Sequence, residues 1–152
     1  SDTISLAALT EEVFCDLDPV AEKHQVRLIQ TDGDCTVTGS YILLYRAVYN
    51  LVENAIKYNR PSGSVTVSIH TAESAVLEVT DTGIGISPEN QEKIFDPFYR
   101  VDKSRSRAMG GAGLGLALVS EIARQHNGQV KVTQSSEKGS TIALILPKST
   151  DY

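Results

Sequence analysis

A stripe of amide, carboxylate and ammonium groups lies along one predicted helix of this chain. At about 100° per residue, Asn50, Asn54 and Lys57 fall within roughly 60° of one another, with Glu53 beside them. Asparagine is a mediocre helix former, so two asparagines on one polar face favour a chemical role over simple solvation. Amide oxygens ligate Mg²⁺ and a lysine ammonium meets phosphate, so the stripe predicts a metal and phosphate site; the alternative is a solvated helix face.

A glycine loop, DTGIGI (81–86), directly follows a predicted strand. Gly83 and Gly85 permit positive φ and a close backbone approach to a ligand, and the Asp81 carboxylate is an acceptor suited to an exocyclic amine. A Rossmann fingerprint requires a third glycine where this chain has Pro88, so that interpretation is rejected. A plain turn remains the alternative.

A second glycine-rich segment comes just before another predicted helix. Gly110, Gly111, Gly113 and Gly115 occupy four of six positions there, and the backbone N–H groups and positive dipole at a helix start bind anions. A Walker P-loop is excluded because Leu116–Ala117 stands where lysine and serine or threonine are required. The alternative is a flexible linker into the helix.

The residues between the two glycine segments include a long loop without sustained periodicity, 96–113. Loops of this length are usually functional or disordered. The loop carries four basic residues, Arg100, Lys103, Arg105 and Arg107. Their side chains either are solvated or form a phosphate sensor that closes over a bound nucleotide.

The elements that position these groups follow from hydrophobic periodicity. Steps of three and four residues predict helices over 4–21, over 40–58 with Ser40 as N-cap, and over 114–128 with Asn127–Gly128 as the stop. Ser87 and Pro88 predict the start of a short helix that reaches residue 94. Alternating patterns predict strands over 26–30, 64–70, 75–81, 129–134 and 140–147, and a short edge segment over 35–38.

Composition indicates one globular α/β domain. The 152 residues are 41% hydrophobic and carry a net charge of −5, which argues against a nucleic-acid binder that works by bulk charge. Cys15 and Cys35 match neither a metal motif nor a disulfide framework and are interpreted as thiols of a reducing compartment. No apolar run reaches the length of a membrane span, and we expect a soluble piece of a longer chain.

Four segments, in this order, resemble the catalytic, ATP-binding domain of sensor histidine kinases, within the group that includes gyrase, Hsp90 and MutL. NLVENAIKY (50–58) resembles the N box, DTGIGI the first glycine box, IFDPFYR (94–100) the F box and GGAGLGLALV (110–119) the second glycine box. The resemblance implies one domain over 1–152 with the Bergerat fold. This is a two-layer α/β sandwich, with a mixed sheet of about five strands under three helices and a mobile ATP lid at about 96–113.

The resemblance also implies roles for the adenine and metal end. Asn54 would ligate Mg²⁺ and Asn50 would support the metal or its waters. Asp81 would accept a hydrogen bond from the adenine amine. Lys57 would contact phosphate, and Tyr58 would lie against the adenine or ribose. Gly83, Gly85 and Ile86 would form the walls of the pocket, and Thr141 would contact the base through water.

At the phosphate end, the resemblance implies that the second glycine box wraps the phosphates through Gly111, Gly113, Leu114 and Gly115. Arg100 would address the γ-phosphate, together with Lys103 or Arg105, and the catalytic groups would be Asn50, Glu53 and Arg100. One departure is Ser40, which stands where the family commonly has aspartate and should still cap the helix.

The implied function is binding of Mg·ATP and transfer of the γ-phosphate to a histidine on a separate dimerisation domain. The phosphate would then pass to a response-regulator aspartate. None of His24, His70 and His126 lies in a phosphoacceptor motif, so we interpret them as structural. The fragment is expected to be a monomer, and the parent protein a membrane-anchored dimer with this domain in the cytoplasm.

Two alternatives remain open. A gyrase- or Hsp90-type ATPase opens its N box with a catalytic glutamate, but this chain has Asn50 there, which leaves Glu53 as the nearby carboxylate. A nucleotide-binding module without transfer is the other alternative. A serine kinase of the anti-sigma type shares the boxes, although the F box favours the histidine kinase branch.

Overall fold

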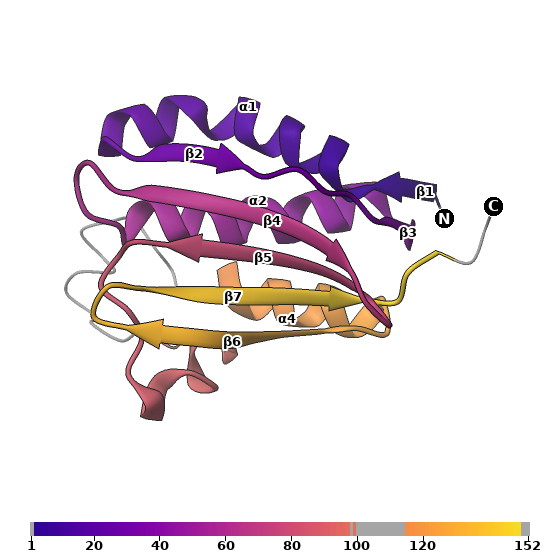
Figure 1. Ribbon diagram of the computed structural model, residues 1–152. Coiled ribbons are helices and arrows are strands. Elements are labelled where there is room, and N and C mark those ends of the chain that lie inside the picture. Colours follow the sequence, from indigo (N-terminus) through magenta and orange to yellow (C-terminus); the bar gives the residue numbers. More distant parts are fainter. Residues whose placement is uncertain (1, 98, 100–114, 150–152) are drawn as a thin grey trace.

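The computed structural model describes residues 2–97, 99 and 115–149 (Figure 1). Five strands form one mixed sheet in the order β2-β4-β5-β7-β6, with β2 parallel to β4 and the other neighbours antiparallel. These strands are β2 (Arg27–Gln30), β4 (Ser64–Thr71), β5 (Ala75–Asp81), β6 (Gln129–Ser136) and β7 (Gly139–Leu146). The predicted mixed sheet of five strands is therefore confirmed.

Three α-helices of the described residues cover one face of this sheet: α1 (Leu6–His24), α2 (Tyr41–Lys57) and α4 (Gly115–Gln125) (Figure 1). Alternate residues of each strand face these helices and are buried, whereas their neighbours point to the opposite face. On β4 and β5 the buried residues are Val65, Val67, Ile69, Ala75, Leu77 and Val79. Full burial of one branched apolar side chain stabilises the fold by about 1.5–3 kcal/mol, so the contact between the sheet and the helices is a main part of the core.

The helix α2 begins where the sequence predicts. Ser40 lies in the extended region and its Oγ accepts the backbone N–H of Leu43 at 3.3 Å. One side of the helix is wholly apolar and buried, through Leu44, Ala47, Val48, Leu51, Val52, Ala55 and Ile56. The polar stripe predicted from helical periodicity is therefore forced to the other side.

The start of the chain differs from the prediction. Residues 2–5 form a strand, β1 (Asp2–Ser5), which pairs antiparallel with β3 (Thr36–Gly39) in a separate two-stranded sheet. Ile4 is buried opposite Val37, and α1 begins only after Ser5, whose Oγ accepts the N–H of Ala8 at 3.1 Å. The prediction of a helix from residue 4 is wrong because Ile4 satisfies a helical period while its backbone pairs with β3.

The short helix predicted over 88–94 is also wrong. Two 3₁₀ turns occupy this region, η1 (Pro88–Asn90) and η2 (Lys93–Phe95). Ser87 caps no backbone N–H, because its Oγ accepts the side-chain amide of Asn90 at 2.8 Å. The proline start is correct, but the hydrogen bonding does not extend into an α-helix.

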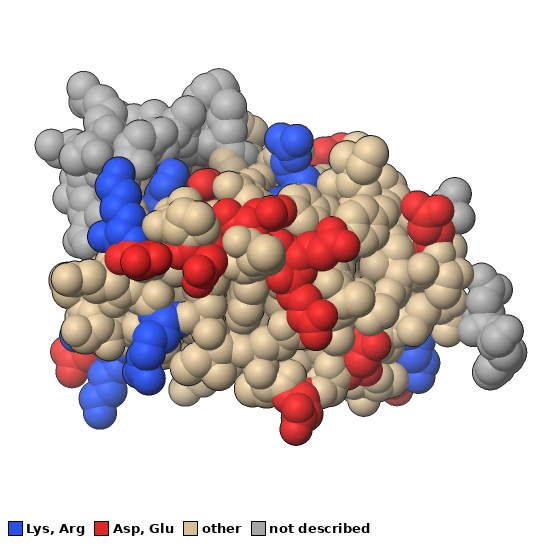
Figure 2. Space-filling model, turned by 90° about the horizontal axis from the view of Figure 1, so that it is seen from above, with Lys and Arg blue, Asp and Glu red and all other residues tan. Residues whose placement is uncertain are grey.

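A row of tyrosines links α2 to α1 across the surface. Tyr41, Tyr45 and Tyr49 are four residues apart on α2, with ring centroids 6.2 and 6.0 Å apart for successive pairs. The hydroxyl of Tyr41 donates to Glu12 and that of Tyr45 donates to Asp16. The view onto α1 in Figure 2 shows acidic side chains gathered on this face, where Glu11, Glu12, Asp16, Asp18 and Glu22 are exposed.

These hydrogen bonds make stability depend on pH in the alkaline range. Burial raises the pKa of Tyr41 from 10.0 to about 12, with a further contribution from its hydrogen bond to Glu12, and the pKa of Tyr45 moves the same way. A raised pKa in the folded state means that the contribution is complete below pH 10 and is lost between pH 10 and 12. We expect the free energy of unfolding, measured by urea denaturation, to fall more steeply over this interval in the wild type than in a Tyr41→Phe, Tyr45→Phe double variant. Equal slopes would contradict the prediction.

Candidate active site

The polar stripe of α2 lies partly exposed beside the start of α4. Asn50, Glu53, Asn54 and Lys57 are all of intermediate exposure, and Nζ of Lys57 lies 3.8 Å from a carboxylate oxygen of Glu53. The side-chain amide of Asn50 donates to the backbone oxygen of Gly115 at 3.4 Å. The structure thus brings the first residue of the N box to the glycine with which α4 begins.

The carboxylate of Asp81 stands at the end of β5 and collects three donors. It accepts the N–H of Gly83 at 2.8 Å, the N–H of Ser140 at 3.3 Å and the hydroxyl of Ser140 at 3.0 Å. Burial raises the pKa of Asp81, and these hydrogen bonds act in the opposite direction because they favour the charged form. The result is a desolvated acceptor whose orientation is fixed before any ligand arrives.

The position predicted at Thr141 requires a correction. Directly opposed residues of antiparallel strands share a face, and Thr141 opposes Thr80, whereas Ser140 opposes Asp81. The Thr141 hydroxyl bonds the hydroxyl of Thr80 at 2.9 Å on the face away from the helices. Ser140 is therefore the residue that reaches Asp81. If the register between β5 and β7 had been known, the alternation of side chains along β7 would have identified Ser140. The sequence alone does not give that register.

Sequence reasoning also missed the contacts that join the end of α2 to the end of β5. Asn59 directly follows the helix predicted over 40–58. Its Oδ1 accepts the hydroxyl of Thr82 at 2.9 Å, its Nδ2 donates to the oxygen of Ser64 at 2.8 Å, and Thr82 Oγ1 accepts the N–H of Ser64 at 2.9 Å. These bonds join the residues after α2 to the residue after β5, where the backbone of Tyr58 approaches Gly83. The signal that could have revealed them is the asparagine directly after the helix, a residue type that bonds nearby backbone.

Two glycines of the DTGIGI loop are required by close backbone approach. A Cβ at Gly83 would lie 2.5 Å from the backbone oxygen of Tyr58. A Cβ at Gly85, where φ is +77°, would lie 2.0 Å from the backbone oxygen of Ser136. The N–H of Ile86 donates to Oγ of Ser135 at 2.7 Å, so the loop is fixed against α2 on one side and β6 on the other.

Part of the predicted phosphate end lies outside the described residues. This holds for Arg100, Lys103, Arg105, Gly111, Gly113 and Leu114. Gly115 is described as the first residue of α4, and Phe95 and Tyr99 of the F box pack against the core. Asn50 therefore meets Gly115, and Asp81 meets Gly83 and Ser140, whereas Thr141 lies on the other face of the sheet.

Comparison with known proteins gives the family. The family described as histidine kinase-, DNA gyrase B- and HSP90-like ATPase matches residues 39–150. The chain belongs to this ATPase family. Its described fold agrees with that of histidine kinase ATP-binding domains: it superposes on the mycobacterial sensor histidine kinase MprB with a TM-score of 0.81, at 27% identity and 97% coverage of both chains. A full-length ShkA structure in complex with AMPPNP shares the fold, with a TM-score of 0.86 at 24% identity over 99% of this chain and 31% of that one.

Curated relatives of this ATPase domain are sensor histidine kinases. The chain is 46% identical over 123 residues to the sensor-like histidine kinase SenX3 of Mycobacterium tuberculosis, covering 78% of this chain and 30% of that protein. It is 43% identical over 140 residues to the sensor histidine kinase RppB of Synechocystis, covering 91% and 30%. The chain thus spans about 30% of the length of these relatives.

The contacts of Asp81 in this histidine kinase-type ATPase domain predict different effects of two neighbouring substitutions. Ser140→Ala removes a hydroxyl donor from the carboxylate, so the pKa of Asp81 should rise further. Thr141→Ala removes a hydroxyl from the opposite face and should leave that pKa as it is. Titration of the Asp81 side-chain carbon signal by NMR measures both. A larger shift in the Thr141 variant would return the predicted role to Thr141.

Proposed function

We propose that this domain binds Mg·ATP and transfers the γ-phosphate to a histidine on a separate dimerisation domain, from which it passes to an aspartate of a response regulator. One observation carries the proposal: α2 contacts both other elements of the site, because Tyr58 at its end approaches Gly83 after β5 and Asn50 in its middle bonds Gly115 at the start of α4. An amine acceptor, an ammonium with two amides, and a helix N-terminus therefore lie along one helix. Membership in the ATPase family and the sensor kinase relatives support it.

At the adenine end, Asp81 would accept the exocyclic amine. Its carboxylate is oriented by Gly83 and Ser140, so binding requires no reorganisation of the acceptor. The backbone oxygen of Tyr58 lies close to Gly83, two residues after Asp81, and we assign the Tyr58 side chain to contact with adenine or ribose. In place of Thr141, we assign Ser140 as the β7 residue that lies next to Asp81 and adenine.

At the phosphate end, Asn54 and Asn50 would hold Mg²⁺ through their amide oxygens, and Lys57 would meet a phosphate. The bond from Asn50 to Gly115 uses the amide nitrogen, which leaves the oxygen in the role of ligand atom. Among the described residues, no group of three or more His, Cys, Asp and Glu side chains lies close enough to hold a metal. This donor set suits Mg²⁺, which keeps waters and takes substrate phosphate oxygens rather than a full protein cage. When bound, the ion neutralises charge on the phosphates.

Phosphoryl transfer requires mainly positioning and charge stabilisation. As the bond between the γ-phosphorus and a phosphoacceptor nitrogen forms, the bond to the bridging oxygen breaks and ADP leaves. We assign the transferring end to Asn50, Glu53 and Arg100, with Lys103 or Arg105 beside Arg100. The ion pair between Glu53 and Lys57 orients the ammonium and occupies the carboxylate that a hydrolytic mechanism would need as a base.

The parent protein is proposed to be a membrane-anchored dimer that carries this domain in the cytoplasm as a monomeric unit. Its partners would be its own dimerisation domain and the cognate response regulator, without nucleic acid. In residues 2–97 and 115–149, no helix has the length and apolar character needed to cross a bilayer.

Calorimetric titration with ATP, with and without Mg²⁺, tests binding. We expect Mg²⁺ to strengthen binding in the wild type, Asn54→Ala to lose most of that enhancement, and Lys57→Ala to weaken ATP more than adenosine. Loss of a charge-assisted phosphate contact corresponds to about 1.5–3 kcal/mol, or roughly 10- to 150-fold in affinity. Lys131→Ala, on the far edge strand, is the matched control and should bind as the wild type does.

The same samples distinguish transfer from hydrolysis. Phosphate release should stay at the level without protein, and labelled phosphate should appear on a phosphoacceptor domain added in trans. Steady release that Glu53→Gln abolishes would replace the proposal with the ATPase alternative. Binding without either reaction would favour a nucleotide-binding module.

A further inference from the structure

The imidazole of His126 joins the end of α4 to the start of α2. Its Nε2 lies 3.1 Å from the backbone N of Ser40, and its Nδ1 lies 2.8 Å from the backbone oxygen of Ile122. A backbone N–H only donates and a carbonyl only accepts, so Nε2 must be the acceptor and Nδ1 must carry the proton. Both ring nitrogens therefore have fixed roles in a neutral imidazole.

This contact completes the cap of α2. In a capping box, the Ser40 Oγ would accept the N–H of the third helical residue, and that residue's side chain would accept the Ser40 N–H. The third residue here is Leu43, which offers no acceptor. His126 supplies the missing acceptor from a different helix.

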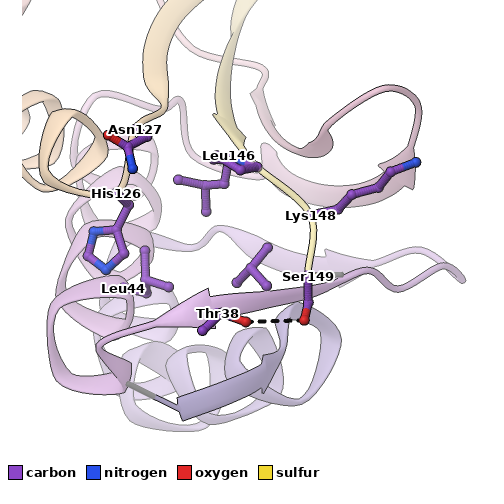
Figure 3. Close-up of a pocket in the computed structure, with 9 residues that line it drawn as sticks. Thr38, Leu44, His126, Asn127, Leu146, Lys148 and Ser149 are labelled. Carbon is purple, nitrogen blue, oxygen red and sulfur yellow. Dashed lines mark hydrogen bonds between the residues drawn. The ribbon is translucent and has the colours of Figure 1, made fainter. Parts of the chain in front are cut away.

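The imidazole is also held by packing. A Cβ at Gly39 would lie 2.4 Å from Cδ2 of His126, so the ring rests directly on the backbone that precedes α2. Leu44 is fully buried next to it, and both side chains line a cleft of about 180 Å³ (Figure 3). Several polar groups of this cleft bond one another or the protein backbone, including the Thr38–Ser149 pair at 3.1 Å.

Among the described residues, two hydrogen bonds connect α2 and its cap with α4 and the residue after it. Ser40 meets His126 at one end and Asn50 meets Gly115 at the other, so the helices run antiparallel. The two contacts are ten residues apart on α2 and eleven apart on α4, which is about 15 and 17 Å at 1.5 Å per residue. Because these two distances are similar, both contacts form together when the helices lie in one register. A slip of α4 by one residue would break both.

We propose that His126 is a positioning residue of the phosphate end: by accepting the Ser40 N–H, it holds α4 in the register that keeps Gly115 against Asn50. The inference rests on the proposed function for its effect on ATP. Loss of one hydrogen bond to a phosphate lowers affinity by up to about tenfold, so a shift of Gly115 should weaken the binding of ATP although His126 lies at the far end of α4.

The test compares His126→Leu, which fills the space without an acceptor, with His126→Gln, whose amide oxygen can occupy the position of Nε2. His70→Leu, on the opposite face of the sheet, is the control. Titrations with Mg·ATP and with adenosine should show that His126→Leu weakens ATP about tenfold and adenosine little, whereas His126→Gln restores most of the ATP affinity. Equal losses for both ligands, or no loss in the leucine variant, would overturn the proposal.

A second measurement needs no nucleotide. Nitrogen-15 NMR of the wild type should show the His126 proton on Nδ1, and His126→Leu should shift the side-chain amide of Asn50, about ten residues away from the mutated contact along α2. An unshifted Asn50 amide would overturn the positioning role. If the wild type bound no ATP while the Asn50 amide still shifted, the proposed function would fail and the positioning role would stand. If His126→Leu did not fold, His126→Gln would decide instead, because it provides an acceptor for the Ser40 N–H. An Asn50 amide signal at the wild-type position in His126→Gln would support the proposal, and a shifted signal would overturn it.

Discussion

The burial of one side of α2 decides where the polar groups of the site lie. Seven apolar residues of this helix pack inward, and the helical period then leaves Asn50, Asn54 and Lys57 together on the other side. Core contacts fix the helix, and hydrogen bonds at both of its ends add to this. Asn59 and Thr82 join its C-terminal end to β5, and Ser40 joins its N-terminal end to α4. A substitution in the apolar side would therefore move the whole stripe, whereas a polar substitution would change one contact.

Asp81 illustrates how the fold tolerates a carboxylate next to its core. Burial disfavours the charged form, and an unpaired carboxylate here would be costly. Two backbone N–H groups and one hydroxyl offset this penalty, and they come from a glycine loop and from the neighbouring strand. The same donors fix the orientation of the carboxylate, so the arrangement that makes the group tolerable also makes it a specific acceptor.

Local periodicity was sufficient for most of the fold, because α2, α4 and the hairpin of β4 and β5 carry strong patterns that agree with their turns and caps. Predictions failed where a long-range partner decides the conformation. Ile4 satisfies a helical period but pairs with Val37. The confusion of Thr141 with Ser140 has the same origin: a shift by one residue reverses the face of a strand, and the register depends on β5, sixty residues earlier in the chain. The short helix predicted after Ser87 failed for a local reason, because the Ser87 hydroxyl bonds the side chain of Asn90. His126 was interpreted as structural, and nothing in its sequence surroundings indicates that it accepts a hydrogen bond from Ser40.

The two halves of the site are held by different kinds of interaction. The half proposed to recognise adenine is built from central strands and from a glycine loop fixed on both sides, so its geometry follows from the sheet itself. The half proposed to recognise phosphate depends on α4, which packs on α2 and buries Val119, Ile122 and Ala123. Apolar packing holds the two helices together, whereas hydrogen bonds at specific backbone atoms select one axial register, and these come from Ser40 with His126 and from Asn50 with Gly115. Within the described residues, the first half therefore follows from the sheet, and the second depends on how α4 lies along α2.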